Sequence, residues 1–199
     1  MKIIIAEDQG MLRGAISRLL GMEDDIEVVG EADDGEEALA LIRGREVDIA
    51  VLDIEMPLRS GLEVAEILRA EGHPCKVAIV TTFARGGYYQ RAVQADVQGY
   101  LLKEAPVTEL AKALRKIHAG GRVFSPHLTF AMREDTNPLT PRETEVLTYL
   151  KRGHTVAEIS RLLYLSPATV RNYISEILQK LEAKTRIDAV AIAENKGWL

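Results

Sequence analysis

The sequence predicts an α/β flavodoxin-like (βα)5 domain followed by a small all-α domain of four helices that contains a helix-turn-helix. Short apolar segments alternate with helical patterns over residues 1–120, and strand signals disappear after residue 140. A stretch with Gly and Pro pairs separates the two regions. Strand–helix alternation is typical of a parallel sheet covered by helices on both faces. We therefore place the first domain at 1–120, a linker at 121–138 and the second domain at 139–199.

The predicted strands are short and rich in Val, Ile and Leu, as expected for strands buried on both faces. They span residues 2–6, 26–29, 47–52, 77–80 and 99–102. Between them, apolar residues recur at spacings of three and four, which indicates helices with one buried face. These sets are Ile16, Leu19 and Leu20; Ala38, Leu39 and Ile42; Leu62, Ala65 and Leu68; and Leu110, Ala113, Leu114 and Ile117.

The linker is predicted from turn-forming pairs at Gly120-Gly121, Ser125-Pro126 and Asn137-Pro138. Within it we expect one short helix at residues 127–132.

Four helices are predicted in the second domain, at residues 141–152, 156–163, 167–181 and 187–195. Thr140 followed by Pro141 and Glu143 is a capping-box start, and Ser166 before a proline begins the third helix in a similar way. Gly153 is placed to end the first helix. Only three residues join the second and third helices, which is the helix-turn-helix pattern.

Charge is divided unevenly along a chain with 25 Lys and Arg and 30 Asp and Glu. Residues 139–199 carry 9 basic and 7 acidic side chains, a net charge of +2, whereas residues 1–138 are net −7. Such asymmetry is compatible with nucleic-acid binding by the second domain. We expect no contact with a membrane, because the chain has no run of 18 apolar residues. With no signal peptide and a lone, core-forming Cys75, we expect a cytoplasmic protein.

Acidic residues follow two of the predicted strands. Glu7 and Asp8 end the first strand, and Asp53 ends the third. In a doubly wound sheet, ligands bind beyond the carboxyl ends of the strands, so these three carboxylates should share one pocket. Like charges at that distance repel unless a cation lies between them. Mg²⁺ is the cation we expect, because it prefers oxygen ligands.

Lys103 and Thr81 complete this pocket, since they end the fifth and fourth strands. Phosphoryl transfer depends mainly on positioning and on neutralising the charge of three phosphoryl oxygens. Asp53 is therefore predicted as the nucleophile that forms an aspartyl phosphate. Lys103 would pair with one phosphoryl oxygen, and Thr81 would donate a hydrogen bond to another.

The first domain resembles the receiver domain of two-component response regulators. The resemblance covers residues 2 to about 120 and is carried by AED at 6–8, DIEMP at 53–57, Gly61, TTFA at 81–84 and GYLLK at 99–103. It implies that a sensor histidine kinase phosphorylates Asp53. It also implies that Mg²⁺ is held by Asp8, Asp53 and the backbone carbonyl of Glu55, with Glu7 assisting through water. Thr81 and Tyr100 would form the switch pair, Thr81 moving toward the phosphoryl group as the aromatic ring rotates inward.

The second domain resembles the LuxR-type helix-turn-helix of NarL/FixJ-class regulators. The matching residues are LTPRETEVL at 139–147, Gly153, EIS at 158–160, Leu163, Ser166, TVRNYISEILQKL at 169–181 and Arg186. In such a domain, the third helix would pack through an apolar stripe and present its polar side to DNA. The stripe is formed by Val170, Ile174, Ile177, Leu178 and Leu181.

Candidate DNA contacts lie off that stripe. Arg suits guanine and Asn suits adenine through paired hydrogen bonds, so Arg171 and Asn172 are predicted to contact base edges. Polar residues beside them or at other helix ends are candidates for further base or phosphate contacts: Thr155, Thr169, Ser175, Lys180, Lys184 and Arg186.

A domain of low net charge should bind double-stranded promoter DNA weakly as a monomer, so we expect a homodimer formed on phosphorylation. Ala189, Val190, Ile192 and Ala193 of the last helix form either a dimer surface or core. The receivers could dimerise through the fourth helix and fifth strand, or through the first and fifth helices.

Two alternatives remain open from the sequence. One is an enzyme, a flavodoxin-like hydrolase or phosphatase with Asp53 as nucleophile, for which Glu55 is a poorly placed acid–base partner. The other is a constitutive DNA-binding protein with an unphosphorylated receiver. Within the regulator class, AEDQGML, VTTFAR and RNYISEIL are similar to a Gram-positive regulator of fatty-acid desaturation, which implies membrane-lipid or other envelope-stress genes as targets.

Overall fold

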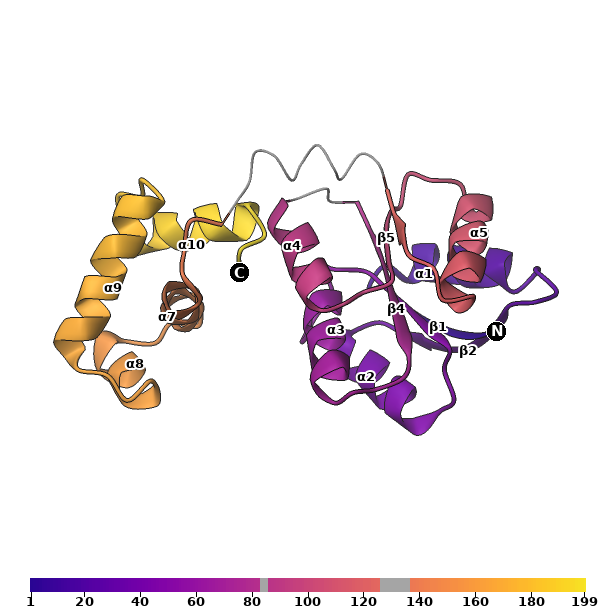
Figure 1. The fold of residues 1–199 in the computed structure, drawn as a ribbon, viewed down its shortest axis with the longest axis horizontal. Coiled ribbons are helices and arrows are strands. Elements are labelled where there is room, and N and C mark those ends of the chain that lie inside the picture. Colours follow the sequence, from indigo (N-terminus) through magenta and orange to yellow (C-terminus); the bar gives the residue numbers. More distant parts are fainter. Residues whose placement is uncertain (83–85, 126–136) are drawn as a thin grey trace. The chain divides into compact units, whose positions relative to one another are not determined.

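The computed structural model describes residues 1–82, 86–125 and 137–199, with the backbone alone at residue 86. The chain divides into two compact units, an α/β unit and a helical unit, and each is described by itself (Figure 1). The helix predicted at residues 127–132 lies outside the described residues, as do residues 83 and 84 of the TTFA motif.

The first unit is a parallel sheet with strand order β2-β1-β3-β4-β5-β6. Its elements are β1 (Lys2–Ala6), α1 (Gly10–Leu20), β2 (Glu27–Ala32), α2 (Gly35–Gly44), β3 (Ile49–Leu52), α3 (Gly61–Ala70), β4 (Lys76–Thr81), α4 (Gly86–Gln94), β5 (Gly99–Leu102), α5 (Val107–His118) and β6 (Val123–Phe124). The predicted α/β fold is confirmed, and the observed order places β1 beside β3.

The four central strands, β1, β3, β4 and β5, are buried on both faces because alternate side chains enter different cores. Ile3, Ile5 and Val51 join the core with α1 and α5. Ile4 and Leu52 point the other way and are also fully buried. Figure 1 shows α1 and α5 on one side of the strands and α2 and α3 on the other.

The sixth strand falls within the stretch predicted as linker, so that prediction was wrong at residues 123 and 124. Gly120 has φ 91°, a left-handed conformation that turns the chain back from α5 toward the sheet. Val123 and Phe124 then pair with Gly99 and Tyr100 of β5. A two-residue edge strand has too little periodicity to be recognised from sequence, and the Gly pair there is equally typical of a linker.

The helical unit contains α7 (Pro141–Lys151), α8 (Val156–Leu162), α9 (Pro167–Lys180) and α10 (Arg186–Asn195). All four predicted helices are present, within two residues of the expected ends. The predicted caps at Thr140 and Ser166 accept hydrogen bonds from backbone N–H groups, and Gly153 has φ 82°. Val170, Ile174 and Ile177 of α9 pack into a core shared with the other three helices.

No helix among the described residues is both long enough and apolar enough to span a membrane.

Candidate functional site

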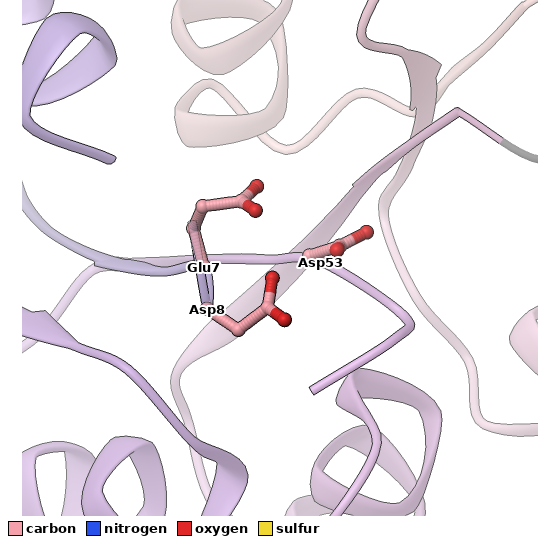
Figure 2. A group of neighbouring side chains, drawn as sticks. All are labelled: Glu7, Asp8 and Asp53. Carbon is pink, nitrogen blue, oxygen red and sulfur yellow. The ribbon is translucent and has the colours of Figure 1, made fainter. Parts of the chain in front are cut away.

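Three carboxylates converge at the carboxyl edge of the sheet, as predicted. Glu7 and Asp8 follow β1, and Asp53 follows β3; one oxygen of each lies within 4.8 Å of those of the other two (Figure 2). The convergence results from the pairing of β1 with β3, which aligns Ala6 with Leu52. Glu7 and Asp53 are buried, whereas Asp8 is exposed.

Lys103, which follows β5, provides an ammonium group in this pocket. Its Nζ lies 2.5 Å from Glu7 Oε2 and 2.9 Å from Asp53 Oδ2. None of the three side chains is more than 7% exposed. The Lys103 backbone N–H donates to the carbonyl of Thr81, which places the lysine at the end of β4. The structure thus brings together the predicted nucleophile, its acidic neighbours and the lysine.

The ionisation of the pocket follows from burial and charge. Burial raises the pKa of Glu7, and the negative charge of Asp53 raises it further against the opposing effect of the Lys103 hydrogen bond. Burial by itself would lower the pKa of Lys103, but its hydrogen bonds to Glu7 and Asp53 outweigh this and raise it. Lys103 therefore stays charged, and one ammonium group faces three carboxyl groups.

The donor set fits a hard divalent cation. Mg²⁺ binds carboxylate and carbonyl oxygens and retains several waters, and the exposed Asp8 leaves one side of the cluster open to solvent. Glu55 lies exposed in the loop after Asp53; the metal-binding role of its backbone carbonyl stays a prediction.

Asp53 is held firmly in place by its backbone. Its N–H donates to the carbonyl of Ala6 at 2.9 Å, and its Oδ1 accepts from the Ile54 N–H at 2.7 Å. Gly61, the first residue of α3, packs against it so closely that a Cβ there would overlap the carbonyl oxygen of Asp53. This close approach is the reason that residue 61 must be Gly. The sequence identified Gly61 only as part of the receiver motif, without this reason.

The predicted switch residues are both fully buried. Thr81 ends β4, and Tyr100 lies in β5 with its ring 6.0 Å from that of Tyr89 in α4. Tyr89 also meets the ring of Phe124 in β6, at 5.7 Å. The Tyr100 carbonyl accepts the Ser125 N–H at 2.9 Å, so the predicted switch is connected to the residue that directly follows β6. That connection was not anticipated, because β6 was not predicted.

Comparison with known proteins identifies the family of this chain. The response regulator receiver domain family matches residues 3–115. The chain belongs to the two-component response regulators. The luxR family of bacterial regulatory proteins matches residues 137–193, which contain the four C-terminal helices.

The response regulator is similar over its full length to transcriptional regulatory proteins of the same domain composition, one of them, YvfU, itself uncharacterised. It is 55% identical to the transcriptional regulatory protein YvfU and 49% identical to the transcriptional regulatory protein DesR, both of Bacillus subtilis. Both alignments cover all of this chain, and they cover 100% of the length of YvfU and 98% of the length of DesR. DesR is the Gram-positive regulator to which three segments of the sequence were found similar above, so that narrower similarity is confirmed. Both relatives are transcriptional regulators, which argues against the hydrolase alternative.

Solved structures agree with this assignment. The response regulator ChrA of a heme-sensing two-component system has a TM-score of 0.58 at 30% identity, covering 100% of this chain and 98% of that one. A LuxR-family DNA-binding response regulator from Staphylococcus aureus has a TM-score of 0.57 at 43% identity, covering 59% of this chain and 98% of its own.

The predicted DNA-contact residues of the regulator lie on the surface of the helical unit. Arg171, Asn172 and Ser175 are exposed on α9, opposite its buried stripe. Thr169 is half-buried, and its hydroxyl lies 2.8 Å from that of Ser166 at the start of the helix. Thr155, Lys184 and Arg186 are also exposed, although the Thr155 hydroxyl already serves the capping box of α8.

Lys180 has an internal partner that the sequence did not reveal. Its Nζ lies 2.8 and 2.7 Å from the two carboxylate oxygens of Glu143 at the start of α7. Glu143 is only 1% exposed and also closes the α7 capping box with Thr140. The ion pair therefore joins α7 to the end of α9, and the proposed phosphate contact of Lys180 has to compete with it.

The predicted dimer surface on α10 is partly core. Ala189 and Ala193 are buried inside the helical unit at 1% and 0% exposure, whereas Val190 and Ile192 are half-buried. The large apolar side chain that this helix exposes is Ile187, at 81%.

Replacing Glu143 with Gln should reduce the acid sensitivity of the helical unit. Burial alone would raise the pKa of Glu143, but hydrogen bonds from Lys180 and Thr140 outweigh it and lower the pKa. A carboxyl group with a lowered pKa in the folded state contributes stability above its unfolded pKa and loses it as the pH falls through the folded pKa. Urea unfolding at pH 7 and pH 3.5, followed by Trp198 fluorescence, should show a smaller stability difference in E143Q than in the wild type. An equal difference would contradict the role of the pair.

Proposed function

We propose that a sensor histidine kinase transfers a phosphoryl group to Asp53 and that the phosphorylated regulator forms a homodimer on promoter DNA. The single observation that carries this proposal is the convergence of Glu7, Asp8, Asp53 and Lys103 at one sheet edge. In the transfer, an Asp53 carboxylate oxygen forms the new P–O bond, and the P–N bond of the phosphohistidine breaks with its electrons returning to the imidazole.

The pocket residues have distinct tasks in this step. Asp53 is oriented by the Ile54 N–H and by Lys103, so its carboxylate faces the incoming phosphorus without further rearrangement. Lys103 would then pair with a phosphoryl oxygen. Mg²⁺ bound by Asp8, Asp53 and the Glu55 carbonyl, with Glu7 acting through water, would supply charge neutralisation for the phosphoryl oxygens.

The switch would act through residues at the end of β4 and in β5. We propose that Thr81 donates its hydroxyl to the phosphoryl group and that the Tyr100 ring follows into the space near it. Phosphorylation would thereby shift a pre-existing equilibrium toward a dimerising state. With DNA as its partner, we place the protein in the cytoplasm, and its similarity to DesR supports membrane-lipid or envelope-stress genes as targets.

Incubation of the full chain with acetyl phosphate and Mg²⁺ tests this proposal. We expect intact mass spectrometry to show the gain of one phosphoryl group and sedimentation velocity to show a dimer. No adduct would favour a constitutive DNA-binding protein with a structural receiver and would overturn the proposal. DNA selection with the phosphorylated protein would then supply the binding site.

Replacing Arg171 with Ala should weaken DNA binding selectively. An arginine that pairs with a base edge contributes about 1–3 kcal/mol of discrimination, so the R171A variant should lose about 5- to 150-fold in affinity for the selected site and little for random DNA. In contrast, Lys184→Ala should weaken both DNAs equally and lower the salt dependence by about one phosphate contact. Fluorescence anisotropy at several salt concentrations measures both effects. Equal losses on the two DNAs for R171A would contradict base contact.

A further inference from the structure

Arg13 of α1 reaches back to the acidic loop at the end of β1. Its Nη1 donates to the backbone carbonyl of Glu7 at 2.5 Å, and its side chain is only 20% exposed. No motif in the sequence indicated this residue, because its contact is with a backbone atom.

The guanidinium of Arg13 is itself held in position from β2. Its Nε lies 3.5 Å from Glu31 Oε2, and the other oxygen of that carboxylate accepts the Ser17 hydroxyl at 2.7 Å. Ser17 lies one helical turn after Arg13 on the same face of α1. Glu31 thus fixes the direction of the guanidinium and balances its charge.

The carbonyl that Arg13 binds belongs to the peptide unit between Glu7 and Asp8. A peptide unit is planar and rigid, so holding its oxygen fixes the position from which the Asp8 side chain extends. The Glu7 N–H is held as well, by the carbonyl of Ala32 at 3.1 Å. Within the described residues, the Asp8 carboxylate has no hydrogen-bond or ion-pair partner, so its placement beside Asp53 depends on this backbone.

We propose that Arg13 is a positioning residue of the metal site, which keeps the Asp8 carboxylate within reach of Asp53. The proposal rests on the proposed function of the pocket as a Mg²⁺-dependent phosphoacceptor site. Positioning and charge have opposite effects on Mg²⁺ affinity: a nearby guanidinium repels a cation, whereas a correctly placed carboxylate attracts one. Whether the Mg²⁺ Kd rises or falls when Arg13 is replaced therefore decides between the two effects.

Isothermal titration of the full chain with Mg²⁺ provides the test. Residues that orient metal ligands typically contribute 10- to 100-fold in metal affinity, so Arg13→Met should raise the Mg²⁺ Kd about tenfold. Ser17→Ala, which changes no charge but releases Glu31, should raise it less. Arg18→Met removes the same charge from an exposed position on the same helix and should leave the Kd unchanged.

Two further measurements complete the test. Amide hydrogen exchange at Glu7, whose N–H donates to the Ala32 carbonyl, should be faster in metal-free R13M than in the metal-free wild type. Phosphorylation by acetyl phosphate at limiting Mg²⁺ should be slower in R13M than in the wild type, whereas R18M should keep the wild-type rate. An unchanged or lower Mg²⁺ Kd in R13M would overturn the positioning role. This conclusion would hold even if R13M were less stable than the wild type. A wild-type protein that binds no Mg²⁺ and accepts no phosphoryl group would instead overturn the proposed function.

Discussion

Replacing Asp53 with Asn should abolish both phosphoryl uptake and the increase in DNA affinity that a phosphodonor produces. The amide of Asn has nearly the same shape but lacks the negative charge and nucleophilic oxygen that form the P–O bond. The other buried carboxylate, Glu7, also pairs with Lys103, but it accepts its backbone N–H, from Gln9, at 3.3 Å, compared with 2.7 Å from Ile54 to Asp53. Intact mass spectrometry and DNA-binding anisotropy, each with and without acetyl phosphate, measure the two losses.

The matched control for this variant is Asp34→Asn. Asp34 is the N-cap of α2, where its Oδ1 accepts the N–H groups of Glu36 and Glu37. Asn caps helices about as well as Asp, so the D34N variant should be phosphorylated normally. A D53N protein that still gains one phosphoryl group would show that the nucleophile is another residue.

Replacing Gly61 with Ala should destabilise the receiver by about 3 kcal/mol and slow its phosphorylation. Overpacking usually costs about 1–3 kcal/mol, and the upper value applies here because the added methyl would meet the backbone carbonyl of Asp53 instead of a side chain that can rotate. Any relief of this overlap must move Asp53 or the start of α3. The midpoint of urea unfolding of the receiver and the rate of phosphoryl uptake measure the two effects.

Gly14→Ala provides the control for Gly61→Ala. A Cβ at Gly14, within α1, would meet no heavy atom within 4 Å, and Ala in a helix is about 1 kcal/mol better than Gly. The G14A variant should therefore be slightly more stable than the wild type. If G61A proved as stable as the wild type, the close approach of α3 to Asp53 would not be real.

Much of the pocket could be predicted because its residues occupy strand ends. Asp53 and Lys103 directly follow β3 and β5, and in a parallel sheet the ends of neighbouring strands lie at one edge. The sequence could not give their mutual arrangement: only the structure shows that Lys103 binds Glu7 as well as Asp53. Arg13 escaped prediction entirely, since a contact with a backbone carbonyl leaves no pattern in residue types.

The same division holds for the helical unit. The caps at Thr140 and Ser166 and the apolar stripe of α9 are local or periodic features, so the helices were predicted within two residues of their ends. The pairing of Lys180 with Glu143 joins residues 37 positions apart. No local pattern indicates such a pair, so the sequence predicted Lys180 only as an exposed basic residue of the helix.

The sequence by itself determined the two-domain fold, the strand ends that carry the acidic residues and the polar side of α9, because each depends on spacing along one strand or helix. Tertiary structure decided the sixth strand, the support of the Glu7–Asp8 peptide by Arg13 and the pairing of Lys180 with the buried Glu143. These depend on which segments meet in space, where burial and charge act between residues that no local pattern connects.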